Sequence, residues 1–206
     1  DTPFHTQTEV CMGCGACVSV CPVTNIDLEL GDVDPEMTGE CEGCDSCSSV
    51  CPGAFIPRSE MEEIVFGRKR KDDENFFGQY KDHLVTYAKH ENIHHAGVGG
   101  GTVTALLLYA LDEGIIDGAI VAGYDENEPW KVKAKIATNK EDLLNCVRSK
   151  YAICNILTAL REAVDQGLEK IAIVALPCHT YALRKMLLYN MNELVDKVEL
   201  ILGLYC

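Results

Sequence analysis

The pattern of apolar and polar residues changes near residue 82. Beyond it, apolar stretches of strand length alternate with segments of helical periodicity. Strands are predicted at 83–89, 117–124, 131–138, 170–175 and 197–204, and helices at 102–113, 140–147, 153–166 and 178–189. Asn139 is placed to cap the second of these helices. Strands that alternate with helices indicate an α/β domain, which we assign to residues 82–206.

The first 57 residues follow no such period. They are short segments interrupted by Gly, Pro, Cys and Asp, and a chain this short and loop-rich cannot build a sufficient core from side chains alone. Residues 11–22 recur in outline as residues 41–52, an internal repeat. Residues 58–81 mix charged and aromatic side chains without a clean period, and we interpret them as a linker.

Each repeat has the spacing C-x2-C-x2-C-x3-C-P, which is typical of two-cluster ferredoxins. Three thiolates of one repeat bind one [4Fe–4S] cluster, and the fourth Cys binds the other cluster. Zinc is the alternative, but zinc sites generally use two separated C-x2-C pairs. The spacing predicts an α+β ferredoxin-like module over residues 1–57, with two ligand sets: Cys11, Cys14, Cys17 and Cys51, and Cys41, Cys44, Cys47 and Cys21.

Glycines and prolines in the repeats shape the backbone around the predicted cluster ligands. Gly13, Gly15 and Gly43 let the backbone turn tightly and bring N–H groups near the sulfurs. Pro22 and Pro52 prevent a helix from continuing past the fourth ligand. Because no secretory leader precedes the twelve cysteines, disulfides are disfavoured and metal is the better explanation.

Charge is concentrated in the same module. Residues 1–57 contain ten acidic and no Lys or Arg side chains, whereas the remainder contains 22 acidic and 18 basic ones, which sum to the net charge of −14. This excess of negative charge disfavours binding to nucleic acid and favours binding to a basic surface of a partner protein. A role in solubility alone is the alternative explanation. The apolar runs are too short to cross a membrane, so no transmembrane segment is expected.

The two ends of the sequence indicate missing residues. The chain begins with Asp1 rather than Met, and it stops at Cys206, where the last predicted strand should enter a loop. We therefore expect the α/β domain to be truncated at its C-terminus.

A glycine-rich segment precedes the helix predicted at 102–113. Residues 97–101 are Gly-Val-Gly-Gly-Gly, and Thr102 and Thr104 follow. Bare amides and the positive end of a helix dipole favour an anion such as phosphate. The segment matches neither the dinucleotide fingerprint nor the P-loop, so a tight helix-packing loop is an equal alternative.

Four cysteines lie outside the repeats. Cys178 starts a predicted helix, where a thiolate is stabilised, and Cys206 follows a strand, so the two could share a third cluster or be buried free thiols. Cys146 and Cys154 are interpreted as core residues on helix faces. His94 and His95 are placed in a surface loop, and His179 is interpreted as a helix cap rather than a proton relay.

Several of these motifs occur together in one known family. The stretch GGGTVTALLLYALDEGIIDG at 99–118, Ser-Lys-Tyr at 149–151, Leu-Pro-Cys at 176–178, Ala-Leu-Arg-Lys-Met at 182–186 and Gly-Leu-Tyr-Cys at 203–206 resemble the beta subunits of coenzyme F420-reducing hydrogenases and dehydrogenases. The members most similar to this chain carry a two-cluster module before a flavin domain, as in the input subunit of coenzyme F420H2 dehydrogenases. The coenzyme F420-dependent sulfite reductase is also similar.

The resemblance implies an FAD-binding domain. The residues that match its flavin positions are Gly99, Gly100, Gly101, Thr102, Thr104, Ser149 and Lys150. Cys178 and Cys206 match ligands of a cluster beside the flavin, which favours a third [4Fe–4S] cluster with further ligands beyond this chain. The family commonly has Gln after the Pro-Cys pair, where this chain has His179.

The implied activity is hydride exchange between coenzyme F420 and FAD, with single electrons relayed through the clusters. Hydride transfer requires no side-chain acid or base, so no catalytic residue is predicted. The expected partner is a larger redox subunit or fused catalytic domain, in the cytoplasm of an anaerobe or, through that partner, at the inner membrane face. The alternatives are a related flavoprotein with another organic substrate and a non-catalytic electron-transfer subunit.

Overall fold

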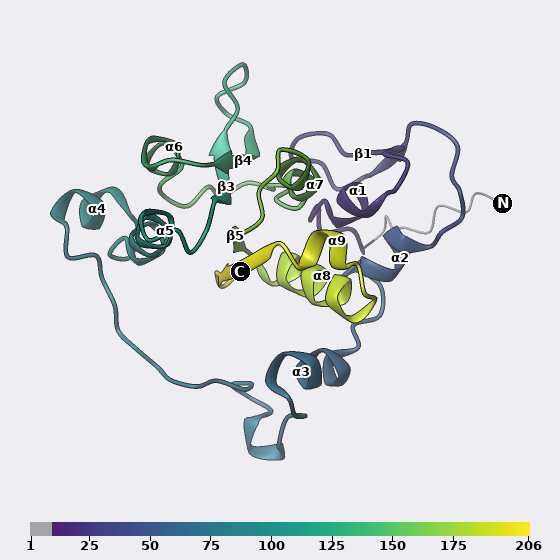
Figure 1. Ribbon diagram of the computed structural model, residues 1–206, viewed down its shortest axis with the longest axis horizontal. Coiled ribbons are helices and arrows are strands. Elements are labelled where there is room, and N and C mark those ends of the chain that lie inside the picture. Colours follow the sequence, from purple (N-terminus) through teal and green to yellow (C-terminus); the bar gives the residue numbers. More distant parts are fainter. Residues whose placement is uncertain (1–9) are drawn as a thin grey trace.

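The computed structural model describes residues 10–206. Their α/β part is built on a mixed four-stranded sheet of order β4-β3-β5-β6 (Figure 1). The strands are β1 (Ile26–Asp27), β2 (Glu36–Met37), β3 (Gly118–Tyr124), β4 (Val132–Ala137), β5 (Ile171–Ala175) and β6 (Val198–Gly203). The α-helices are α1 (Ala16–Val20), α2 (Ser46–Val50), α3 (Arg58–Phe66), α4 (Glu91–Ala96), α5 (Thr102–Asp112), α6 (Lys140–Asn145), α7 (Thr158–Asp165), α8 (Pro177–Leu188) and α9 (Asn192–Val195).

The sheet combines a hairpin with parallel crossovers. β3 pairs antiparallel with β4, from Ala119 opposite Ala137 to Tyr124 opposite Val132. β3 and β6 both run parallel to β5, so the carboxyl ends of these three strands lie at one edge of the sheet. Ligands of open α/β sheets bind outside this edge.

Alternating strand residues face two helical layers. Ile120 and Ile173 belong to the core that includes α7 and α8, whereas Ala119, Val121 and Ala172 pack with α5 and α6. In Figure 1 the two helix pairs accordingly lie on opposite sides of the sheet. Burial on both faces explains why β3 and β5 are continuous apolar runs in the sequence. The predicted α/β architecture is therefore confirmed.

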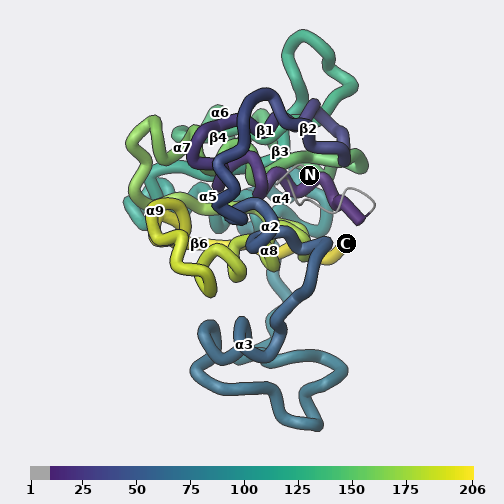
Figure 2. The backbone as a smooth tube through the Cα atoms, turned by 90° about the vertical axis from the view of Figure 1, so that its right-hand side faces the viewer, coloured from purple at the N-terminus to yellow at the C-terminus, as the bar shows by residue number. Residues whose placement is uncertain are grey.

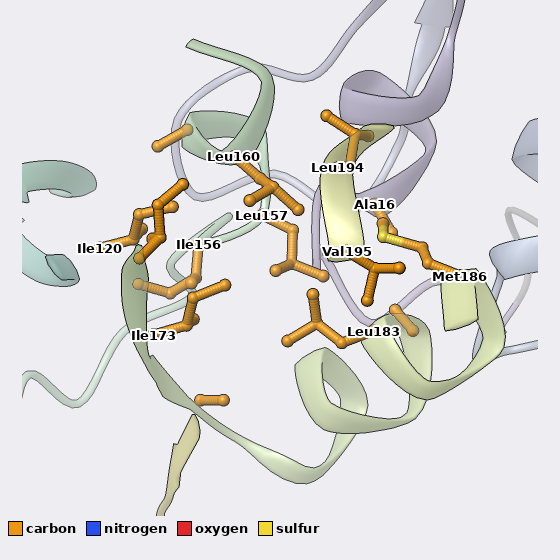
Figure 3. Packing of buried hydrophobic residues seen from close by; sticks show 14 of the residues in the cluster. Ala16, Ile120, Ile156, Leu157, Leu160, Ile173, Leu183, Met186, Leu194 and Val195 are labelled. Carbon is orange, nitrogen blue, oxygen red and sulfur yellow. The ribbon is translucent and has the colours of Figure 1, made fainter. Parts of the chain in front are cut away.

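The N-terminal cysteine module, described here from residue 10 to 57, shares the core of the α/β domain. Ala16 and Val20 of α1 and Val50 of α2 are buried in the same cluster as Leu157 and Leu183 (Figure 3). The module thus obtains from α7 and α8 the apolar core that its own length cannot provide.

Hydrogen bonds fix how the module sits on the domain. The Asn155 amide donates to the carbonyl oxygens of Gly13 (2.8 Å) and Asp32 (3.0 Å) and accepts from the Gly31 amide (3.0 Å). The Leu157 amide donates to the Cys14 carbonyl at 3.0 Å. Because Asn155 is buried, each of these bonds would be costly to break without replacement.

Three expectations about local structure were wrong. Residues 83–89 are not a strand, since no sheet edge pairs with them and Leu84 and Val85 are exposed. His94 and His95 lie in α4 rather than in a loop. The helix predicted at 153–166 begins only at Thr158, because residues 153–157 contact the cysteine module. The predicted linker contains α3 and a short 3-10 helix, Asp72–Glu74, and Figure 2 shows this segment extending away from the rest.

No helix in residues 10–206 has both the length and the apolar character that crossing a bilayer requires.

Replacing Gly15 tests the packing between module and domain. Both Gly15 (φ +80°) and Gly43 (φ +68°) are left-handed, but a Cβ at Gly15 would lie 2.7 Å from the Thr158 amide, whereas one at Gly43 meets nothing within 4 Å. We expect Gly43→Ala to lower the free energy of unfolding by about 1 kcal/mol. Gly15→Ala should cost roughly 2–4 kcal/mol, since overpacking adds to the backbone strain. Anaerobic urea unfolding followed by circular dichroism measures both, and equal losses would contradict the packing argument.

Candidate functional site

The eight repeat cysteines gather around two separate cavities. The first is lined by Cys11, Cys14, Cys17 and Cys51, and the second by Cys21, Cys41, Cys44 and Cys47. In each cavity three cysteines come from one repeat and the fourth from the other. The fold thus brings together the two groups of four that the spacing predicts.

The four cysteines of each group surround a cavity. A cubane of several iron and sulfide atoms needs thiolates distributed around a space of this kind, so the arrangement fits a cluster.

Backbone amides already point at two of the sulfurs. The Gly13 amide lies 3.4 Å from the Cys11 Sγ, and the Gly43 amide lies 3.4 Å from the Cys41 Sγ. Hydrogen bonds of this kind stabilise thiolate ligands and tune the potential of a bound cluster. The equivalence of the two contacts shows that the internal repeat is structural as well as sequential.

The two cavities differ in exposure. Cys14 and Cys17 are buried, and burial raises the pKa of Cys17 to about 12. Cys44 is exposed, and hydrogen bonding from Ser46 lowers its pKa. Cys21 and Cys47 of the second site are buried as well, and burial raises the pKa of Cys47, so bound iron has to offset the cost of buried thiolates at both sites. Cys44 is the one exposed cysteine among the eight.

A buried lysine lies beside the first cavity. The Lys185 Nζ on α8 donates to the carbonyl oxygens of Cys51 (2.7 Å) and Phe55 (3.0 Å). Burial lowers the pKa of Lys185, and the negative charge of a Cys51 thiolate opposes that shift. The sequence analysis includes Lys185 in the motif at 182–186 but assigns it no role at a cluster, because nothing in that helical pattern indicates what its side chain contacts.

A third and much larger cavity, of ≈ 630 Å³, lies at the carboxyl ends of β3, β5 and β6. Six of the seven residues predicted to contact flavin line it: Gly99, Gly101, Thr102, Thr104, Ser149 and Lys150. Gly100 is not among the lining residues and instead packs against Tyr87. The walls also include Val121, Val174 and Leu176. Segments 50 to 100 residues apart in sequence therefore meet around one space.

The glycine-rich loop combines the two alternatives that the sequence left open. Gly101 has φ +72°, and a Cβ there would lie 2.4 Å from the Ile93 carbonyl oxygen, so the loop does pack tightly on α4. The same loop lines the large cavity and leads into the first turn of α5. Tight packing thus places bare amides at the cavity wall.

The Lys150 ammonium group is bound to backbone carbonyl groups rather than free to bind a phosphate. Its Nζ donates to the carbonyl oxygens of Cys146, Val147 and Arg148 at the end of α6. Burial lowers the Lys150 pKa. In the structure this side chain holds the loop that forms one wall of the cavity.

Two cysteines outside the repeats, Cys178 and Cys206, lie near the large cavity. Cys206 lines that cavity, and Cys178, in the first turn of α8, directly precedes the lining residue His179. Cys178 interacts electrostatically with Cys206 and with Cys11 and Cys14 of the first cysteine site. The backbone amides at the start of α8 lower the Cys178 pKa, as expected for a helix start, but burial raises it by more.

Three further side chains line the large cavity: Cys146, Cys154 and His179. Cys146 and Cys154 were expected on helix faces, but Cys146 follows the last residue of α6 and Cys154 precedes α7. Both remain packed against the core. Burial raises the pKa of Cys154 to about 12, so it is a neutral thiol.

His179 caps α8, as the sequence predicted. Its Nδ1 accepts a hydrogen bond from the Leu176 amide at 3.0 Å, which leaves any proton on Nε2. The side chain is 2% exposed, and burial lowers its pKa to about 4. A neutral imidazole is thus part of the cavity wall at neutral pH.

These features define a class of protein: a two-site iron–sulfur module packed on an α/β domain that has a large cavity at the carboxyl ends of its parallel strands. Known families agree with that description. A 4Fe-4S dicluster domain model matches residues 4–52, and the models of the coenzyme F420 hydrogenase/dehydrogenase beta subunit match residues 84–161 (N-term) and 168–206 (C terminus). The chain belongs to this beta subunit family, as the resemblance of its motifs predicted.

Similar proteins come from methanogenic archaea. The chain is 36% identical to the coenzyme F420-dependent sulfite reductase of Methanocaldococcus jannaschii, over 96% of the chain and 30% of the reductase. It is 33% identical to a component of the F(420)H(2) dehydrogenase of Methanosarcina mazei, over 97% of the chain and 54% of that component. The chain thus spans about a third to a half of these relatives.

A solved structure supports the fold as well. A chain in the F420-reducing [NiFe] hydrogenase complex from Methanosarcina barkeri superposes with a TM-score of 0.55 at 37% sequence identity. The match covers 58% of the present chain and 42% of the other.

The burial of His179 predicts a pH dependence of stability. Its pKa is about 4 in the folded protein and 6.5 when unfolded, so the unfolded state binds a proton first as pH falls. The resulting stability is complete above pH 6.5 and is lost as pH falls toward 4. Between pH 7 and about pH 5.5 the loss should be roughly 1 kcal/mol.

The measurement is urea unfolding at the two pH values, with His179→Asn as the comparison. Asn keeps an acceptor for the Leu176 amide but does not titrate. The free energy of unfolding of the variant should therefore fall by roughly 1 kcal/mol less than that of the original protein between the two pH values. An equal pH dependence in the two proteins would contradict the assignment.

Proposed function

We propose that this chain is the input part of an iron–sulfur flavoprotein that exchanges a hydride between coenzyme F420 and FAD. The observation that carries the proposal is the ≈ 630 Å³ cavity, where the glycine-rich loop, residues 146–151 and the ends of β5 and β6 meet beside the first cysteine site. Its size is within the usual range for small-molecule sites. The names of the hydrogenase, dehydrogenase and reductase relatives point to coenzyme F420 as the substrate.

The residues present fit a flavin. Bound FAD would supply a carrier that takes up electrons in pairs and releases them singly. The loop at 97–101 offers amides at a helix start for its phosphates, and Thr104, in the first turn of α5, adds a hydroxyl group to the lining of the cavity. The apolar walls, among them Val121 and Val174, would exclude water from the ring system.

Electron transfer would then follow the order of the sites in the fold. Cys206 lines the large cavity and Cys178 interacts electrostatically with both Cys206 and Cys11 of the first cysteine site, and we propose that Cys178 and Cys206 bind a third cluster whose other ligands lie outside this chain. Electrons would pass next to the first site and then to the second. We propose that each of these two sites holds one [4Fe–4S] cluster, bound by four of the eight cysteines. Burial keeps His179 and Cys154 in the cavity wall neutral at neutral pH, in keeping with hydride transfer that needs no acid or base.

The second cysteine site is the proposed point of exchange with the partner. Cys44 is exposed there, and the cavity is lined by Glu42 and Asp45. Negative side chains at an exposed site favour a partner with a basic surface. The partner that we propose is a larger redox subunit or a fused catalytic domain.

The test is an anaerobic optical titration of the purified protein with reduced coenzyme F420. Loss of the flavin absorbance followed by broad bleaching of the clusters is the expected result. A flavin that stays oxidised would redirect the proposal to another organic substrate. Clusters without flavin would identify an electron-transfer subunit and overturn it.

Thr104→Val tests the flavin site with minimal disturbance. Loss of one neutral hydrogen bond should weaken FAD binding about fivefold, as measured by fluorescence titration of the deflavinated protein. Thr138→Val, which changes an exposed residue outside the cavity, should leave the affinity unchanged. Equal affinities in all three proteins would remove Thr104 from the site.

A further inference from the structure

Lys185 differs from the other basic side chains in its relation to the clusters. Within residues 10–206, it is the only Lys or Arg that donates a hydrogen bond to the carbonyl of a predicted cluster ligand. Its side chain reaches from α8 across the interface to Cys51 and Phe55, and only 2% of the residue is exposed. No acidic side chain pairs with it in the described chain, because its ammonium bonds to carbonyl groups alone.

The position of Lys185 has an electrostatic consequence for the first cluster. One-electron reduction adds a negative charge to a centre that is already anionic because of its four thiolates. In a buried site, this added charge is poorly solvated and the reduced state is disfavoured. A cation close to Cys51 stabilises the reduced state more than the oxidised state and so raises the reduction potential.

The second site differs from the first in its neighbouring charges and in its access to solvent. The ionisable side chains that line its cavity, apart from the cysteines, are Glu42 and Asp45, and solvent reaches Cys44. Water takes the place of a fixed cation there. The two sites thus have equivalent ligands but different means of accommodating the extra electron.

We propose that Lys185 is a positioning residue that sets the reduction potential of the first cluster, and that it does so by its charge. This inference rests on the cluster ligation in the proposed function. It does not depend on coenzyme F420 or FAD, because Lys185 acts on the cluster directly. The energetic reason for a buried lysine at this interface is then redox tuning in addition to its two hydrogen bonds.

The experiment is a mediated redox titration of the full, anaerobically purified chain, followed by electron paramagnetic resonance. Lys185→Met should shift the midpoint potential of the first cluster to more negative values and leave that of the second unchanged. At an effective dielectric constant of about 20, the charge of a near neighbour changes the equilibrium constant for reduction by a factor of about ten or more. We therefore expect the loss of the Lys185 charge to lower the equilibrium constant for one-electron reduction of the first cluster at least tenfold, which corresponds to about 59 mV.

Matched variants separate charge from structure. Lys185→Arg keeps the charge at every accessible pH and should shift the potential far less than Lys185→Met. Lys185→Gln keeps a donor without the charge, and it replaces Lys185→Met if that variant fails to assemble. Lys197→Met removes a lysine paired with Glu169 and should change neither midpoint. Cys44→Ser alters the second cluster and Cys178→Ser alters the proposed third cluster, so that the midpoint unaffected by either variant is assigned to the first cluster.

Two results would overturn the proposal. One is an unchanged first midpoint in a fully loaded Lys185→Met or Lys185→Gln protein. The other is an equal shift in Lys185→Arg and the neutral variants, which would indicate hydrogen-bond geometry rather than charge. Because dithionite and mediators supply the electrons, a failure of the coenzyme F420 reaction leaves this experiment interpretable.

Discussion

The contact between the first cysteine loop and residues 153–158 is the constraint on which the rest of the structure depends. A loop of this kind exposes carbonyl and amide groups that must be satisfied once it is buried. The Asn155 side chain satisfies the Gly13 carbonyl of this loop together with the Asp32 carbonyl and the Gly31 amide of the segment between β1 and β2, and the Leu157 amide satisfies the Cys14 carbonyl. The two halves of the chain are therefore joined by groups that neither half can satisfy alone.

The same contact determines where electrons could pass. Residues 146–152 and Cys154 line the large cavity, and residues 155–158 hold the first cysteine loop, so one continuous segment connects the two sites. α8 repeats this connection with its first turn at the cavity and with Lys185 at Cys51. Two segments that each contact both sites keep their separation fixed, which single-electron transfer between buried centres requires.

Sequence reasoning predicted what depends on local chemistry. The cysteine spacing predicted the two groups of four cysteines that line the two cavities, the continuous apolar runs predicted β3 and β5, and Asn139 caps α6 through the Asp142 amide as expected. Features that depend on distant neighbours were not predictable in this way. Residues 83–89 alternate like a strand but find no partner, and residues 153–157 look helical but are held open by the cysteine module.

The internal repeat makes this limit concrete. Gly15 and Asp45 occupy equivalent left-handed positions before α1 and α2, yet only Gly15 lies against Thr158. At position 45 a side chain is accommodated because solvent lies where the first repeat meets the domain. Equivalent motifs thus acquire different burial, and with it different electrostatics, from what packs on them. The sequence of a cluster motif indicates which metal centre it binds, whereas the surroundings of that centre also include residues outside the motif, such as Lys185 at Cys51.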